Sequence, residues 1–306
     1  MARERMVFIG VTTAGSSIMA LFPRWAEMLV LDAELDGYDI PLDAPPGAFR
    51  AAVEHIVGSD DVRGGLVTTH KLGIFHHAGD LFDDFDDNAR LCSEVSCISK
   101  HNGRIVGHAK DPITAAMTLD EMLGRDYWAT SAGQVLCLGA GGAGVAITLC
   151  LTRGEAPPAH IVLTDLDETR LESAAAALGR VRTSAQLEYR VASGKEAARL
   201  LSELPPGSLI INATGMGKDR PGSPLPPDAG WPLGGIAWDL NYRGDLEFLR
   251  QARAVEREHS LRVFDGWRYF LYGWTEHIAE VFGIQMTPER FASLAEAAQS
   301  FRPPPS

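Results

Sequence analysis

The second half of the chain alternates short apolar runs with longer segments in which apolar residues recur at helical spacing. The apolar runs lie at 135–138, 161–164, 187–191, 208–213 and 236–240. Each run has the length of a strand, and the segments between the runs are long enough for helices. Strands that alternate with helices predict a parallel, doubly wound α/β sheet whose ligand binds beyond the carboxyl ends of the strands.

The first half also predicts an α/β arrangement, in a less regular order. The expected elements are strands at 7–9 and 64–68, a hairpin that closes at 103–108, and helices at 17–31, 45–57 and 112–123. The run 30–35 either extends the first helix or begins another strand.

A polar linker at 124–133 separates the two patterns, and helical spacing returns over 269–301 apart from 283–288. We therefore expect an N-terminal α/β domain over 1–123, completed by the helices of 265–306. A second, doubly wound domain is expected over 124–264.

Glycines follow the apolar run at 135–138 in the pattern Gly139-x-Gly141-x-x-Gly144. The first permits a tight turn, the second lets backbone N–H groups approach a diphosphate, and the third lets a helix pack against the sheet. The next run ends at Asp165, where a carboxylate would accept hydrogen bonds from ribose hydroxyls. The pattern predicts a Rossmann-type dinucleotide site, the alternative being a glycine-rich turn in another α/β protein. Its candidate residues include a polar pair after the fourth run: Gly139, Gly141, Gly142, Gly144, Asp165, Asn212 and Thr214.

The acid at the end of the second run also bears on which dinucleotide binds. A 2′-phosphate beside Asp165 would meet like charge, to which Asp167 adds. No cation precedes Arg170, which we place in the turn into the next helix. We therefore expect NAD in preference to NADP.

The composition limits the partners and the compartment. A net charge of −12 over 306 residues disfavours nucleic acid and anionic membranes as partners. The four cysteines form no C-x-x-C pair, and the chain enters its first strand without a signal-peptide core, so we expect a cytoplasmic protein. The histidines at 70, 76, 77 and 108 lack metal-ligand spacing, so no metal site is expected.

Two charged residues of the first half are the best candidates for proton transfer. Lys71 and Asp111 each follow a short apolar run that ends in small or polar residues, where a residue of a ligand crevice would stand. From the residues alone, the alternative is that both are solvated charges.

Segments along nearly the whole chain resemble, in order and spacing, the sequence patterns of the shikimate dehydrogenase family. The family patterns G-x-P-x-x-H-S-x-S-P, N-V-T-x-P-x-K, G-A-V-N-T and G-x-N-T-D correspond to 10–19, 65–71, 93–97 and 107–111. Similar segments in the second half are 139–143, 210–214, 239–242 and 265–271. The resemblance implies a two-domain NAD(P)-dependent oxidoreductase of shikimate- or quinate-like hydroxy acids.

Carried over by position, the resemblance assigns Lys71 and Asp111 to the family's catalytic pair. It implies that Lys71 relays the proton of the hydroxyl that is oxidised, and that Asp111 binds the same hydroxyl and orients the lysine. The implied substrate-binding residues are Ser16, Ser17, Thr68, Ser96, Lys110 and Tyr242.

Most groups that would bind substrate hydroxyls depart from the family pattern. The departures are Ile18, Gly65, Val67, Thr69, Ser96, Lys110 and Gly273, where the family has serine, asparagine, threonine, proline, asparagine, threonine and glutamine. A buried hydroxyl that loses its partner costs roughly 1–3 kcal/mol, so several losses predict a different cyclic or small hydroxy acid as substrate. Lys110 would replace the serines as the anchor of its carboxylate.

Two alternatives stay open. One is a catalytically silent relative that senses NAD or a cyclic acid, which the eroded motifs favour and the retained lysine and aspartate oppose. The other is an enzyme like methylenetetrahydrofolate dehydrogenase, which shares the two-domain design. The expected partner is a small molecule, and the candidate assembly is a homodimer.

Overall fold

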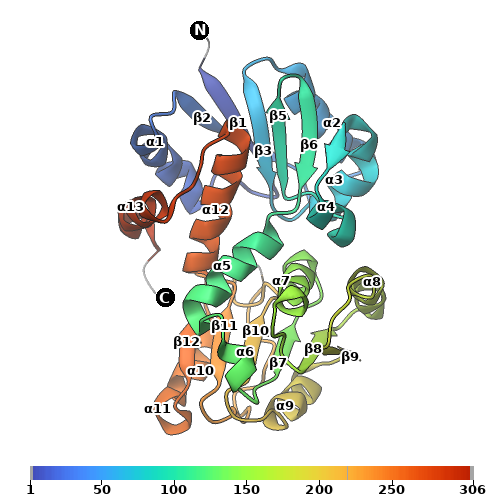
Figure 1. The fold of residues 1–306 in the computed structure, drawn as a ribbon, viewed down its shortest axis with the longest axis vertical. Coiled ribbons are helices and arrows are strands. Elements are labelled where there is room, and N and C mark those ends of the chain that lie inside the picture. Colours follow the sequence, from blue (N-terminus) through green and yellow to red (C-terminus); the bar gives the residue numbers. More distant parts are fainter. Residues whose placement is uncertain (1–2, 219, 304–306) are drawn as a thin grey trace. The chain divides into compact units, whose positions relative to one another are not determined.

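A computed structural model describes residues 3–218 and 220–303 (Figure 1). Its internal contacts divide these residues into two compact units, 3–111 with 271–303 and 112–270. The sequence analysis expected divisions after 123 and at 265, whereas the contacts group the helix 111–123 almost entirely with the second unit. Each unit is described by itself.

The first unit is built on a mixed six-stranded sheet in the order β2-β1-β3-β5-β6-β4. The bounds are β1 (Glu4–Gly10), β2 (Ala33–Asp39), β3 (Val62–Val67), β4 (Asp84–Phe85), β5 (Cys97–His101) and β6 (Arg104–His108). β1 pairs in parallel with β2 and β3, while β5 is antiparallel to both of its neighbours, β3 and β6. β3 and β6 therefore run in the same direction and end at the same edge of the sheet.

Helices cover this sheet and bury its apolar residues. They are α1 (Ser17–Leu29), α2 (Pro46–Gly58), α3 (Lys71–Ala78), α4 (Asp87–Cys92) and α13 (Pro288–Ala298), with most of α12 (Trp267–Phe282). One core cluster joins the sheet to α2 and α3 and includes Val7, Phe49, Val67 and Ile74. The expected hairpin is confirmed, because Asn102 and Gly103 connect β5 and β6 with positive φ at both positions.

The second unit holds a sheet of six parallel strands in the order β9-β8-β7-β10-β11-β12 (Figure 1). The strands are β7 (Val135–Leu138), β8 (His160–Asp165), β9 (Gln186–Val191), β10 (Leu209–Asn212), β11 (Ile236–Asp239) and β12 (Arg262–Phe264). All five predicted strands are confirmed, and β12 is an addition. The order reverses between β7 and β10, and a dinucleotide fold binds its ligand at such a point.

The helices of the second unit follow its strands. They are α5 (Asp111–Leu123), α6 (Tyr127–Thr130), α7 (Gly142–Arg153), α8 (Glu168–Leu178), α9 (Gly194–Ser202), α10 (Glu247–Ala254) and α11 (Glu256–His259). The short helix α6 lies within the predicted linker. Across the described ranges, the helices lack the length and apolar character that crossing a membrane requires.

Candidate active site

An ion pair between Lys71 and Asp111 lies at the edge where β3 and β6 end. Lys71 is the first residue of α3, which follows β3 after three residues, and Asp111 opens α5 three residues after β6. Lys71 Nζ donates a hydrogen bond to Asp111 Oδ2, and the two side chains are 17% and 10% exposed. The structure therefore brings together the two residues that the sequence analysis selected for proton transfer, 40 positions apart.

The charge state of this pair follows from its surroundings. Burial disfavours the ammonium of Lys71, but the nearby carboxylates of Asp111 and Glu94 outweigh that effect and raise the pKa of Lys71 above its ordinary value. Lys71 is therefore charged and holds a proton that it can donate.

Backbone hydrogen bonds fix the segments that carry the pair. Val95 N–H donates to Lys71 O at 3.1 Å, and Thr68 N–H donates to Ile9 O at 3.0 Å. The Ser96 hydroxyl accepts from Lys110 N–H at 2.8 Å, which holds the turn that leads into Asp111. Ser96 is buried, and in this structure its hydroxyl shapes the backbone beside the pair.

The sequence analysis missed two buried ionisable residues that belong to this cluster. Glu94 is 1% exposed, and burial raises the pKa of its carboxyl to about 7 although Lys71 lowers it. His277, on α12, is 3% exposed, and burial lowers its pKa to about 4. The charges of Asp111, Lys71 and Lys110 also act on His277. Neither residue stands in a family pattern as a chemical group, so only three-dimensional proximity identifies them.

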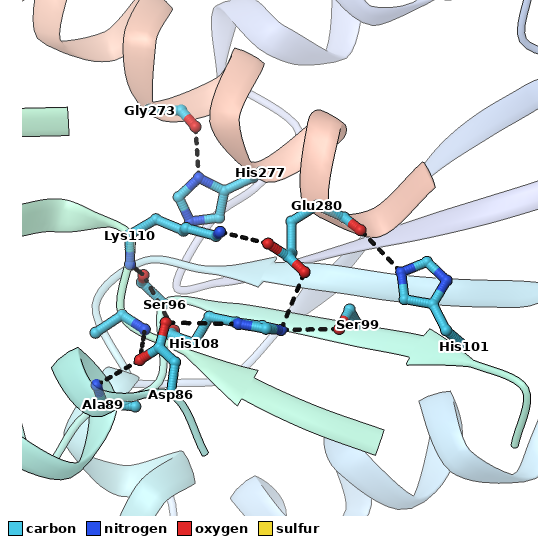
Figure 2. A network of polar contacts seen from close by, with 11 residues as sticks. Asp86, Ala89, Ser96, Ser99, His101, His108, Lys110, Gly273, His277 and Glu280 are labelled. Carbon is cyan, nitrogen blue, oxygen red and sulfur yellow. Dashed lines mark hydrogen bonds and ion pairs between the residues drawn. The ribbon is translucent and has the colours of Figure 1, made fainter. Parts of the chain in front are cut away.

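The histidine has a definite tautomer and one free acceptor. His277 Nδ1 faces the carbonyl of Gly273, so Nδ1 carries the hydrogen (Figure 2). Its Nε2 is then an unprotonated acceptor, and among the described residues it has no hydrogen-bond partner. The family's glutamine would stand at Gly273, one helical turn earlier, so a neutral ring acceptor occupies this stretch of α12 instead.

A second polar network surrounds Lys110. Figure 2 shows Lys110 reaching Glu280 of α12, while the imidazole of His108 lies 3.5 Å from Glu280 and from Asp86. The hydrogen bond from Lys110 lowers the pKa of Glu280 against the opposing effect of burial. Because Glu280 already balances its charge, Lys110 would have to exchange this partner to bind a substrate carboxylate.

The remaining substrate candidates occupy different settings. Ser16 precedes α1 without a side-chain capping bond, and Ser17 begins that helix. The Thr68 hydroxyl donates to Ile9 O at 3.3 Å. Tyr242 belongs to the second unit, where its ring packs against Trp267 and Phe270.

The predicted glycine loop has the form that a diphosphate site needs. Gly139 has φ +106°, and a Cβ there would meet the backbone of Ala213 at 2.7 Å. A Cβ on Gly144 would meet Gly139 O at 2.0 Å, which confirms the close packing of α7 against the turn. A Cβ on Gly141 would meet nothing within 4 Å, so open space lies before the first turn of α7, which begins at Gly142. The residues present fit a dinucleotide.

The ribose candidate is tied to this loop. Asp165 Oδ2 accepts from Ala140 N–H at 2.8 Å, and its Oδ1 accepts from Asp167 N–H at 3.1 Å. Arg170 is in α8 rather than in the turn before it, and its guanidinium lies 4.0 Å from Asp165. The electrostatic setting therefore includes a half-exposed cation as well as the two acids.

Asn212 organises the end of β10. Its Oδ1 accepts from the hydroxyl of Thr214 at 2.6 Å, and its Nδ2 donates to Asp239 Oδ1 at 3.2 Å. Asn212 is fully buried, and Thr214 is half-buried. The pair shapes the loop beside Gly139, and its role in lining a cofactor channel stays a prediction.

No protein-family model matches the chain. The shikimate dehydrogenase (NADP(+)) of Xanthomonas euvesicatoria pv. vesicatoria (strain 85-10) is 31% identical over 232 residues, 72% of each protein. The structure resembles shikimate 5-dehydrogenase of Thermus thermophilus in complex with NADP(H) and shikimate (TM-score 0.71, 24% identity, 96% and 98% of the two chains). It also resembles quinate dehydrogenase of Corynebacterium glutamicum in complex with NAD (TM-score 0.74, 17% identity, 97% and 99%).

Proposed function

Because this chain belongs to the shikimate dehydrogenase family, we propose that it transfers a hydride reversibly between a nicotinamide dinucleotide and a secondary hydroxyl of a cyclic hydroxy acid. The buried ion pair of Lys71 and Asp111 carries this proposal. It supplies a proton donor whose charge is maintained inside the protein, and the glycine loop of the second unit fits the dinucleotide.

Lys71 moves the proton in this reaction. During ketone reduction its ammonium protonates the carbonyl oxygen, and during oxidation the neutral amine accepts the hydroxyl proton. Asp111 holds Nζ in place and stabilises its charged form. The nicotinamide, when bound, supplies or accepts the hydride.

We propose that the substrate is not shikimate but a related cyclic or small hydroxy acid. Ile18 and the segment 65–69 lack several polar groups of the family pattern, and Gly273 replaces its glutamine. The cluster instead buries the ionisable side chains of Glu94 and His277. Since polar sites discriminate strongly against substrates that leave them unpaired, these exchanges favour a changed pattern of hydroxyls.

Steady-state assays with a panel of hydroxy acids and ketones test the proposed function. We expect turnover of at least one cyclic hydroxy acid and weak turnover of shikimate and quinate. Ordinary efficiency with shikimate or quinate would contradict the altered substrate. Dinucleotide binding without turnover of any panel member would instead favour the silent, ligand-sensing relative.

We propose NAD as the preferred cofactor, on the strength of Asp165 and Asp167. The named relative is an NADP enzyme, and Arg170 offers a cation to a 2′-phosphate, so the preference is expected to be moderate. Dissociation constants for both dinucleotides, measured by isothermal titration, test it.

A further inference from the structure

Glu94 is a buried carboxyl that the proposed mechanism does not yet use. It follows Ser93, whose left-handed conformation ends α4, and its own N–H donates to Ala89 O at 3.3 Å. The next residue, Val95, donates its N–H to Lys71 O at 3.1 Å. The chain therefore passes directly against the first residue of α3 and holds Glu94 beside the proton donor.

The carboxyl of Glu94 is costly to keep in this place. The side chain is 1% exposed, and among the described residues its Oε1 has no hydrogen-bond partner. The family pattern G-A-V-N-T has alanine at this position, which would bury no polar group. An unpartnered carboxylate is strongly disfavoured in a protein interior, so this carboxyl retains a proton to unusually high pH.

The charged and titratable groups around Glu94 and Lys71 come from four elements. They are Asp111 of α5, Cys92 of α4, His277 of α12 and Lys71 itself. Asp111 already accepts the hydrogen bond of Lys71 and has no proton to give. His277 is neutral, and its single ring hydrogen faces Gly273 O. Glu94 is thus the buried acid beside Lys71 that both holds a proton and can release it near neutral pH.

We propose that Glu94 supplies the proton that recharges Lys71 after each ketone reduction. The step rests on the proposed function. Hydride addition forms the C–H bond, and Lys71 gives one N–H proton to the alkoxide oxygen and becomes a neutral amine. The protonated Glu94 then gives its proton to that amine, leaving a carboxylate that solvent reprotonates. One hydride and one proton are consumed for each alcohol formed, and the direction from carboxyl to amine is downhill.

The pH profile of ketone reduction by the Glu94→Gln variant tests the assignment. In the unmodified protein, kcat falls as pH rises through about 7, because Glu94 loses its proton. In Glu94→Gln this ionisation disappears and kcat falls roughly tenfold or more at pH 6, towards the low end of general-acid contributions. The solvent isotope effect on kcat increases, because recharging becomes slower. Glu94→Asp restores the ionisation in part.

Glu276→Gln is the matched control. Burial also raises the pKa of Glu276, but the charges that act on it are Lys110 and Glu280 rather than Lys71. This variant should keep the kcat profile of the unmodified protein. An unchanged profile in Glu94→Gln would overturn the inference.

A titration of 13C-labelled glutamate by NMR separates this inference from the proposed function. The signal that Glu94→Gln removes should titrate at about 7 in the unmodified protein. It should titrate higher in Lys71→Met, which lacks the neighbouring cation, and lower in Asp111→Asn, which lacks the neighbouring anion. An ordinary carboxyl titration would overturn the inference even in an active enzyme. If the shifts are present but no ketone is reduced, the proposed function fails and the recharging step fails with it.

Discussion

At the scale of single residues, Lys71 carries the proposed chemistry. Replacing it with methionine keeps most of the side-chain volume and removes the proton donor, so we expect kcat to fall by about 10²–10⁴-fold. Dinucleotide affinity should stay unchanged, because the glycine loop belongs to the other unit. Turnover and titration calorimetry measure the two effects, with exposed Lys195→Met as the control. Normal turnover by Lys71→Met would remove Lys71 from the mechanism.

Glu94 should also make stability depend on pH. Its pKa is raised from 4.5 to about 7 in the folded protein, so the folded state binds the proton more tightly than the unfolded state. Its contribution is therefore fully present below 4.5 and is lost as pH rises towards 7. Between pH 5 and 8, we expect the free energy of unfolding of Glu94→Gln to gain about 2–3 kcal/mol relative to the unmodified protein. Urea denaturation at both pH values measures this gain, and an equal difference at the two would contradict it.

Residue identity alone predicts only part of this cluster. Lys71 and Asp111 can be identified because each follows a strand and matches a family pattern, but nothing local in the sequence pairs them across 40 positions. Glu94 follows a serine and carries a charge, a pattern typical of the surface, yet it is 1% exposed. Burial of such a residue depends on the turn at Ser93 and on the strand beside it, which are tertiary features.

At the scale of elements, the Lys110–Glu280 ion pair joins the turn before α5 to α12 (Figure 2). Glu280→Gln leaves the buried ammonium of Lys110 without its counter-ion, so we expect a loss of about 1–3 kcal/mol, reduced by the partial exposure of Glu280. Adding Lys110→Met should recover most of the loss. Denaturant unfolding of the two single variants and the double variant measures the coupling, and additive effects would show that the pair is not coupled.

Periodicity explains which elements could be predicted from sequence. The strands of the second unit are buried on both faces, so each is a continuous apolar run that ends at a turn. The sequence analysis missed α3 because Lys71–Ala78 is eight residues long, contains Gly73 and has apolar residues without helical spacing. β4 has only two residues, which is too short for any alternation to appear. Long-range packing rather than local pattern defines these elements.

At the scale of the whole molecule, ligand binding should stabilise the native state in proportion to the logarithm of ligand concentration over Kd. A dinucleotide at 100 times its Kd adds about 2.7 kcal/mol, which is visible as a rise in Tm. We expect NAD to raise Tm more than NADP at equal concentration, because Asp165 and Asp167 repel a 2′-phosphate. Arg170→Ala should widen the gap by weakening NADP alone, since Arg170 is the cation near those acids. A larger rise with NADP in the unmodified protein would reverse the preference and make Arg170 the determinant of cofactor choice.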